Sequence, residues 1–406
     1  MMTHAHPDPS QPDIPRALRA AARVQAIEPF RVMEIMKAAS AAAKAGVDVI
    51  SMSVGEPDFT APELVTEAAV RAIRSGATQY TDALGLPALR EAIAAHYRTA
   101  FGVDVDPRRV IVTAGASAGL LLACAALVCE GDDVLMPDPS YPCNRHFVSA
   151  FGGKAVLIPS SAGERYQLTA ELAAQHWTER TRGVIVASPS NPTGTSLTVE
   201  QMRALLAEVR ARDGFAIVDE IYQGLSYGHA PHSALGLDEQ VITVNSFSKY
   251  FNMTGWRLGW LVVPEQLVSV IEKLAQNLFI CPSTVAQHAA LACFHPDSIA
   301  VYEQRRLEFK RRRDFFVPAL RELGFGVPVM PDGAFYVYAD CSGVTHPASG
   351  DSSAFVMAVL RDAGVAFVPG DDFGVAAPHR HVRFSYATAY GRIEEAVHRM
   401  GKLLGR

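Results

Sequence analysis

Residues able to bind an anion or to move a proton follow five short apolar runs of this sequence. They are Gly115, Ala116 and Ser117 after Val110–Thr113, Tyr141 after Asp133–Met136, Asn191 after Val184–Ala187, Asp219 and Tyr222 after Phe215–Val218, and Ser246, Lys249 and Arg257 after Val241–Val244. In an open parallel sheet the ligand lies outside the carboxyl ends of the strands. If these runs are strands of one sheet, the polar residues meet at one edge of it. The sequence therefore predicts a site there for an anionic ligand, with groups suited to acid–base chemistry.

The apolar runs are also the main signal for the fold. Two further runs, Ala155–Ile158 and Leu258–Val263, continue the series, and helical patterns such as Gly119–Cys129 and Thr198–Arg210 lie between runs. Strands that are apolar along their whole length and alternate with helices are typical of a mostly parallel sheet with helices on both faces. The sequence predicts an α/β fold of this kind, with a large domain over residues 60–297.

The two ends of the chain have a different pattern. A helix is predicted over Pro29–Gly46. From about residue 298 the sequence predicts a long helix, two strands and a last helix, namely Val301–Phe316, Phe335–Tyr338, His381–Ser385 and Ile393–Leu404. These segments predict a smaller, discontinuous α+β domain. It consists of residues 15–59, which include an N-terminal arm, and residues 298–406, while residues 1–14 are expected to form a flexible tail.

Composition excludes several classes of function. The 406 residues include 37 Lys and Arg against 42 Asp and Glu, and the net charge of −5 gives no reason to expect binding to nucleic acid or to an anionic membrane. The longest apolar run, Gly119–Cys129, is shorter than the ~18 residues of a membrane-spanning helix, and no signal peptide is visible. The six cysteines contain no C-x-x-C pair, which predicts reduced thiols in a cytoplasmic protein and no metal site.

Two short motifs suggest other chemistry. Gly115–Gly119 matches the G-x-S-x-G turn that presents a serine nucleophile. A serine hydrolase also needs an acid and a histidine, for which Asp219 and His379 or His381 are available, but the upstream oxyanion loop is missing. Ser246–Lys249 fits the S-x-x-K motif of penicillin-binding enzymes, without the companion motifs. Neither motif accounts for the other strand ends, so the hydrolase is a distant alternative.

One family accounts for all the strand ends together. Motifs spread from about residue 29 to the C-terminus resemble those of the class I/II aminotransferases, which are fold-type I pyridoxal-phosphate enzymes. In the order of that family they are Ser53–Phe59, Tyr80, Gly85–Arg90, Asp138–Pro142, Asn191–Gly194, Asp219–Tyr222, Ser246–Lys249, Gly255–Gly259 and Arg383–Ser385. The resemblance implies pyridoxal 5′-phosphate as the cofactor, which needs a lysine, an acidic partner for its ring nitrogen and a phosphate cup.

The resemblance implies a role for each residue that faces the cofactor ring. Lys249 is expected to hold the cofactor as a Schiff base and, once displaced, to carry the proton between the substrate Cα and the cofactor. Asp219 is expected to keep the pyridine nitrogen protonated. Tyr222 and Asn191 are expected to hydrogen-bond the 3-oxygen of the cofactor, and Tyr141 is expected to stack on its ring.

The cofactor phosphate and the substrate carboxylate have expected partners as well. For the phosphate the resemblance implies Gly115, Ala116, Ser117, Ser246 and Arg257. Tyr80 matches a tyrosine that reaches the phosphate of the neighbouring subunit, which implies a homodimer with shared active sites. Arg383 matches the arginine that binds the α-carboxylate of the substrate through two parallel hydrogen bonds, with help from Gly55 and Asn191.

The resulting prediction is ping-pong transamination from an L-amino acid to a 2-oxo acid. The donor stays open between aspartate, alanine and another neutral amino acid. Ser117 stands where some aspartate-preferring relatives carry a lysine, and Arg145 could either hold a distal carboxylate or lie on the surface. A carbon–sulfur β-lyase on the same fold and a non-catalytic regulator are the alternatives, and the net charge of −5 disfavours the regulator.

Overall fold

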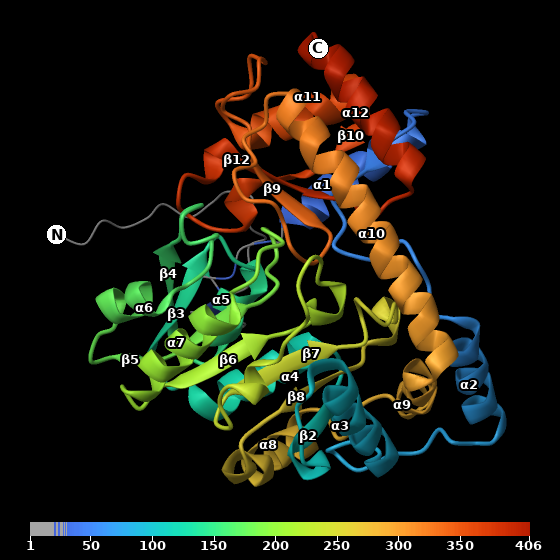
Figure 1. Ribbon diagram of the computed structural model, residues 1–406, viewed down its shortest axis with the longest axis vertical. Helices are drawn as coiled ribbons and strands as arrows, with labels where there is room; N and C mark the ends of the chain where they lie inside the picture. Colours follow the sequence, from blue (N-terminus) through green and yellow to red (C-terminus); the bar gives the residue numbers. More distant parts are fainter. Residues whose placement is uncertain (1–19, 22, 25–26, 28, 30) are drawn as a thin grey trace.

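A seven-stranded sheet forms the centre of the molecule (Figure 1). The computed structural model describes residues 20–21, 23–24, 27, 29 and 31–406, so the tail expected at residues 1–14 lies outside the described residues. In spatial order the strands are β2 (Val110–Thr113), β8 (Gly259–Val262), β7 (Ile242–Ser246), β6 (Phe215–Asp219), β5 (Thr181–Ala187), β3 (Asp133–Asp138) and β4 (Lys154–Pro159). β8 runs antiparallel to β2 and β7, and the other neighbours pair in parallel. The prediction of a mostly parallel sheet is confirmed.

Helices surround this sheet. They are α2 (Glu63–Arg74), α3 (Pro87–Phe101), α4 (Ala116–Leu127), α5 (Pro142–Ala150), α6 (Ala170–His176), α7 (Val199–Arg210), α8 (Glu265–Leu278) and α9 (Thr284–Leu291). The start of α7 is set by a capping box, in which Thr198 accepts from the N–H of Gln201 and the Gln201 side chain accepts from the N–H of Thr198. Within the described residues, no helix has both the length and the apolar character needed to cross a lipid bilayer.

Both faces of the sheet are buried, which explains why its strands are apolar along their whole length. Successive residues of a strand point to opposite faces. Val184 and Val186 of β5 therefore belong to one core, which includes the buried residues of α7. Ile185 between them belongs to a second core, which includes the buried residues of α4 and α8. The sheet thus lies between two layers of helices, and its strand ends are the edge left for a ligand.

The smaller part of the molecule joins both ends of the chain. Its elements are α1 (Arg31–Lys44), β1 (Ile50–Ser51), α10 (Pro296–Glu322), β9 (Tyr336–Asp340), α11 (Ser352–Ala363), β10 (Val365–Ala366), β11 (Val368–Pro369), β12 (His381–Ser385) and α12 (Tyr390–Leu404). β11, β12 and β9 form an antiparallel three-stranded sheet, and β1 pairs in parallel with β10. The pairing of β1 with β10 brings an N-terminal strand beside a C-terminal one. The domain limits 15–59, 60–297 and 298–406 stay a prediction.

The long helix α10 runs from the smaller part down to the helices beside the large sheet (Figure 1) and holds the loop that follows β1. The side chain of Arg312 is 4% exposed and forms ion pairs with Asp58 at 2.7 Å and with Glu308 at 3.0 Å. Arg305 donates to the carbonyl oxygen of Thr60 at 2.6 Å. Loss of either carboxylate would leave a buried charge without its full set of partners, which is costly. The loop after β1 is therefore fixed in place.

Candidate active site

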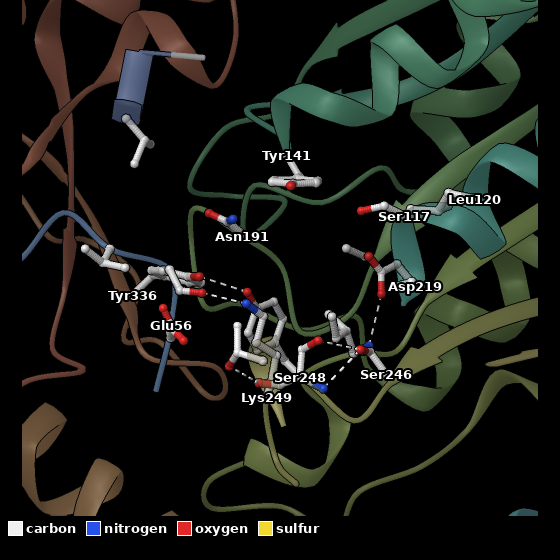
Figure 2. Close-up of a pocket in the computed structure, with 18 of the residues that line it drawn as sticks. Glu56, Ser117, Leu120, Tyr141, Asn191, Asp219, Ser246, Ser248, Lys249 and Tyr336 are labelled. Carbon is white, nitrogen blue, oxygen red and sulfur yellow. Dashed lines mark hydrogen bonds between the residues drawn. The ribbon is translucent and has the colours of Figure 1, made fainter. Parts of the chain in front are cut away.

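The carboxyl ends of β5, β6 and β7 border a cleft of about 340 Å³ between the large sheet and the smaller part. Of the residues predicted for the site, those that line the cleft are Gly55, Ala116, Ser117, Tyr141, Asn191, Asp219, Tyr222, Ser246, Lys249, Arg257 and Arg383. Figure 2 shows Tyr141 and Lys249 on opposite sides of this cavity, with Ser117 towards one end and Tyr336 towards the other. A ligand in the cleft therefore meets different chemical groups at its two ends.

Lys249 lies in the turn that follows β7. Its Nζ donates a hydrogen bond to the carbonyl oxygen of Gly55 at 2.5 Å, in the loop after β1. Burial lowers the pKa of Lys249 to about 8; the carboxylate of Glu56 opposes this shift, and the cations of Arg257 and Arg383 add to it. A lysine with such a pKa is partly neutral near pH 7, so it can accept a proton as well as donate one.

Asp219 is the last residue of β6 and lines the cleft with only 6% of its surface exposed. Within the described residues its carboxylate accepts a hydrogen bond from the backbone N–H of Ile221 at 3.0 Å. Burial raises the pKa of Asp219 to about 6, against the effects of that N–H and of the charge of Lys249. A buried carboxylate of this kind is stabilised by a cationic partner, so a protonated ring nitrogen fits beside it.

Two buried phenols meet in the cleft. The hydroxyl oxygens of Tyr222 and Tyr336 are 2.8 Å apart, and the Cζ of Arg383 lies 4.7 Å from the centre of the Tyr336 ring. A Cβ atom at Gly55 would lie 2.6 Å from the hydroxyl oxygen of Tyr336, so a glycine is needed for the loop to approach this ring. Tyr336 was not predicted, because it does not follow a strand of the large sheet; its signal in the sequence is the predicted strand Phe335–Tyr338.

An anion cradle lies at the N-terminus of α4. Gly115 has a φ of +86°, and a Cβ atom there would lie 2.6 Å from Nη2 of Arg257, so the guanidinium rests against a position that requires glycine. Nη1 of Arg257 donates to the hydroxyl of Ser248 at 3.4 Å, and the hydroxyl of Ser246 donates to that of Ser248 at 2.9 Å. A guanidinium, hydroxyls and helix N-terminal N–H groups suit a phosphate dianion. Ser248 was not predicted, although it lies within a matched motif.

Arg383 is a buried cation without a salt bridge among the described residues. It is 1% exposed; Nη1 donates to Oδ1 of Asn191 at 3.1 Å, and Nη2 donates to the carbonyl oxygen of Ser53 at 2.5 Å. Its Nε has no hydrogen-bond partner in this part of the chain. A buried guanidinium is costly unless an anion balances it. The arginine is therefore suited to bind a carboxylate that enters the cleft.

Three predicted residues do not line the cleft. Gly115 belongs to the turn of the cradle and contacts Arg257, but it is not among the residues that line the cleft. Tyr80 is 81% exposed and lies away from the cleft of its own chain. Arg145 donates to the carbonyl oxygen of Asp372 at 3.1 Å instead of pointing into the cleft. Arg145 is half-buried, and its role as a partner of a distal carboxylate stays a prediction.

In the part of the chain that the structure describes, the arrangement needed for a serine hydrolase is not present. Ser117 and Asp219 line the cleft, but no histidine of the described residues does. The ring of His381 stacks on that of Tyr338, with 4.8 Å between ring centres, and His379 is exposed. A serine without a nearby base is a weak nucleophile. The G-x-S-x-G match therefore reflects the glycine-containing turn of the anion cradle.

Comparison with known proteins identifies the family. Residues 47–400 match the family model of aminotransferase class I and II. The chain is 41% identical over 380 residues to valine–pyruvate aminotransferase of Mycobacterium tuberculosis, which spans 93% of this chain and 97% of that protein. It is 36% identical to aspartate aminotransferase of Geobacillus stearothermophilus, over 95% of this chain and 99% of that protein. A crystal structure of an aminotransferase from Mycobacterium tuberculosis is similar, with a TM-score of 0.91 at 41% identity, over 95% of this chain and 99% of that chain.

These matches extend over both parts of the molecule. They cover the large sheet and the smaller part together, so the predicted fold class, that of the fold-type I aminotransferases, is confirmed as a whole. The relatives are enzymes by name, which removes the support for a non-catalytic regulator. This chain belongs to the class I and II aminotransferases, and it is an enzyme that transfers the amino group of an amino acid.

Proposed function

We propose that this aminotransferase works with pyridoxal 5′-phosphate held in the cleft and bound covalently by Lys249. The observation that carries the proposal is the meeting of Lys249, Asp219 and the cradle around Arg257 in one cavity. The class I and II family generally depends on this cofactor, which supports the same proposal. When bound, the cofactor supplies an aldehyde and an electron-withdrawing ring that stabilises negative charge at the substrate Cα.

Each group of the cofactor has a proposed partner in the cleft. Asp219 pairs with the protonated ring nitrogen, and Tyr222 and Asn191 donate hydrogen bonds to the 3-oxygen. Tyr141 packs on one face of the ring. The phosphate is received by the cradle, whose members are Gly115, Ala116, Ser117, Ser246, Ser248 and Arg257. The buried carboxylate of Asp219 and the glycine that admits the Arg257 guanidinium are the features of this chain that fit the cofactor best.

Two residues act on the substrate in this proposal. Arg383 binds the α-carboxylate, which supplies the missing anion and an acceptor for its Nε. The peptide of Gly55 borders the same place, and Asn191 holds the guanidinium in position. With the carboxylate fixed, the amine of Lys249 would take the proton from the substrate Cα and deliver it to the carbon that was the cofactor aldehyde, and in the second half-reaction it would move a proton in the opposite direction. A pKa of about 8 suits Lys249 for both steps.

The overall reaction is proposed to be a ping-pong exchange between an L-amino acid and a 2-oxo acid. Similar proteins are named for different substrates: valine and pyruvate, aspartate, and aromatic amino acids. These names do not identify the amino donor of this enzyme. Its donor selectivity depends on the side chains at the end of the cleft away from the cradle. A cytoplasmic location is proposed from the pattern of the cysteines alone.

The visible absorption spectrum tests the cofactor and its lysine together. We expect the purified protein to be yellow with pyridoxal phosphate and to lose this band and amine transfer in Lys249→Ala. Lys273→Ala, which changes an exposed lysine of α8, is the matched control and should keep both. A colourless wild-type protein, or a Lys249→Ala variant that still turns over, would contradict the proposal. Release of 2-oxo acid and ammonia without an acceptor would instead indicate a β-lyase.

A homodimer with shared active sites is the second element of the proposal. Tyr80 and Ile280 are 81% and 53% exposed, and they flank the hydrogen bond from Thr284 to the carbonyl of Gln79, so apolar surface is available there for a second copy. If Tyr80 serves the partner's site, mixed dimers of Tyr80→Ala and Lys249→Ala contain one intact site. Mixing the two inactive variants should then restore activity. No recovery, in dimers shown to exchange subunits, would contradict the shared site.

A further inference from the structure

Apolar side chains of α1 face the end of the cleft that lies away from the cradle. Met33 and Met36 line the cleft and are 49% and 37% exposed, and Val54 lines it from the loop after β1. In Figure 2 the blue segment of α1 lies on the same side of the cavity as Tyr336 and far from Ser117. Large exposed apolar side chains that border a ligand site mark a surface that a ligand covers.

The orientation of α1 is fixed by its contacts with the core. Ile35 is buried in the main core, and Val32, which also lines the cleft, is buried in a small cluster with residues of β9 and β11. At the start of the helix, the N–H of Arg31 donates to a carboxylate oxygen of Asp372 at 3.0 Å, which is a favourable place for a negative charge. Because these contacts hold the helix, the two methionines stay directed at the cleft and cannot turn into the core.

Within the described residues of a single chain, this end of the cleft offers no cation to a second carboxylate. Among the described residues the cations that line the cleft are Lys249, Arg257 and Arg383, and each has a partner in the proposed function. Arg145 lies outside the lining. The charged residue near Tyr336 in Figure 2 is Glu56, which has the same sign as a distal carboxylate. Burying a carboxylate beside apolar groups without a cation is unfavourable.

We propose that Met33 and Met36 form the subsite for the side chain of the amino donor. They select an uncharged aliphatic side chain longer than a methyl group, in preference to a methyl group or a second carboxylate. This inference rests on the proposed function, because Arg383 gives the position of the α-carboxylate and Lys249 gives that of the reacting carbon. A flexible thioether adapts to branched and unbranched chains alike, so the subsite specifies polarity and length more than branching.

The first test compares donors on the wild-type enzyme loaded with pyridoxal phosphate. The rate of the first half-reaction is followed by the change in visible absorbance with L-leucine, L-alanine or L-aspartate, so that no acceptor is needed. One methylene in an apolar pocket is worth roughly 10- to 200-fold in specificity, and a half-open subsite belongs at the low end of that range. We therefore expect leucine to react at least about tenfold more efficiently than alanine or aspartate. A preference for aspartate over leucine would overturn the inference.

The second test removes the apolar surface. In the double variant Met33→Ala, Met36→Ala we expect about a tenfold loss for leucine, while alanine, whose methyl group is too short to reach the methionines, changes by less than about twofold. Met357→Ala is the matched control, since Met357 is 46% exposed on α11 and does not line the cleft. Met36→Leu, which keeps apolar volume, should keep the preference for leucine. An equal loss for leucine and alanine would overturn the inference, because it would indicate general damage to the site.

The outcomes separate this inference from the proposed function. A normal visible band with a preference for aspartate overturns the subsite and leaves the cofactor proposal standing. A protein that shows no visible band and converts no donor overturns both. Introduction of a cation on this side of the cleft tests for a gain of function. Met36→Arg should raise the efficiency with aspartate relative to leucine by about tenfold. An unchanged ratio would contradict the proposed position of the donor side chain.

Discussion

The two walls of the cleft are formed by different parts of the chain and carry different side chains. The wall of the large sheet carries Lys249, Asp219 and Arg257, each at the end of a strand or in the turn near it. The opposite wall carries Tyr336 of β9 and Met36 of α1, which come from distant parts of the sequence. The first wall is polar and charged. The second wall is apolar on the side of α1, and on the side of β12 it carries Arg383.

This difference indicates that the two walls have different functions. Groups near the reacting carbon contact the α-amino and α-carboxylate groups, which all amino-acid donors share. They therefore stabilise the transition state of every donor alike. Groups on the wall of α1 contact the part in which donors differ, so they discriminate between donors. Substitutions in the first wall are therefore expected to lower activity equally for all donors. Substitutions of the α1 side chains in the second wall are expected to change the ratio between donors, whereas substitution of Arg383, the proposed partner of the shared α-carboxylate, is expected to affect all donors.

The largest effect is expected for Asp219→Asn. An amide of the same shape cannot balance a protonated ring nitrogen, so the stabilisation of negative charge at the substrate Cα is weakened. We expect kcat to fall by about 10²- to 10⁴-fold with leucine, alanine and aspartate alike. Asp213→Asn, a change at an exposed aspartate just before β6, is the control that should leave kcat unchanged. A loss of kcat with only one of the three donors would contradict the proposal that the two walls have different functions.

A smaller effect is expected for Arg383→Lys. Lysine keeps the charge and one donor but loses the second of the two parallel hydrogen bonds, and a hydrogen bond to a charged group contributes about 1.5–3 kcal/mol. We expect kcat/KM to fall by about 10- to 100-fold for every donor, mostly through KM. Steady-state kinetics with saturating cofactor measure this change. Arg380→Lys, which affects an arginine paired with Asp340 on the surface, should leave kinetics unchanged; an equal loss there would point to damage of β12 and not of the carboxylate site.

The functional residues on the wall of the large sheet could be predicted from the sequence because each of them closely follows a predicted strand. Five apolar runs end in the residues that line the cleft, and the bounds of β2 and β12 agree with the predicted runs. A parallel strand brings the residue that follows it to the same edge as its neighbours, so the position along the chain fixes the position in space. The antiparallel direction of β8 was not predicted, since an apolar run has no signal for direction.

The wall of the smaller part could not be read in the same way. Met33 and Met36 were predicted to lie in a helix, but their direction depends on the contacts of α1 with β10 and β11, which join opposite ends of the chain. Tyr336 faces the cleft because β9 pairs with β12 in a register that no local pattern specifies. Helix α5 was also missed: its nine residues are fewer than the roughly 11 to 18 over which a helical period is read.

A change of a few-fold is expected in the pH dependence of the proton transfer. The pKa of Lys249 is about 8, and its amine must be neutral to accept a proton, so kcat should rise with pH and level off above about 8. Glu56 raises this pKa, so in Glu56→Gln the pKa falls and the rise should move to lower pH, for all donors. Glu63→Gln, at an exposed glutamate of α2, should leave the profile unchanged. A shift to higher pH in Glu56→Gln would contradict the sign of this interaction.

A loss smaller than that of Arg383→Lys is expected for Tyr336→Phe, which tests whether Tyr336 acts with the reacting end of the cleft or with the side-chain end. The hydroxyls of Tyr336 and Tyr222 form a hydrogen bond at 2.8 Å. The ring of Tyr336 packs against Arg383, and phenylalanine would keep this ring contact. Loss of one hydrogen bond costs about 0.5–1.5 kcal/mol, so kcat should fall by about 2- to 10-fold. Because Tyr222 and Arg383 both serve the reacting end, the loss should be equal for leucine and aspartate. Tyr338→Phe, on the same strand but outside the cleft, should have no effect. A changed leucine-to-aspartate ratio in Tyr336→Phe alone would assign Tyr336 to the side-chain wall with α1.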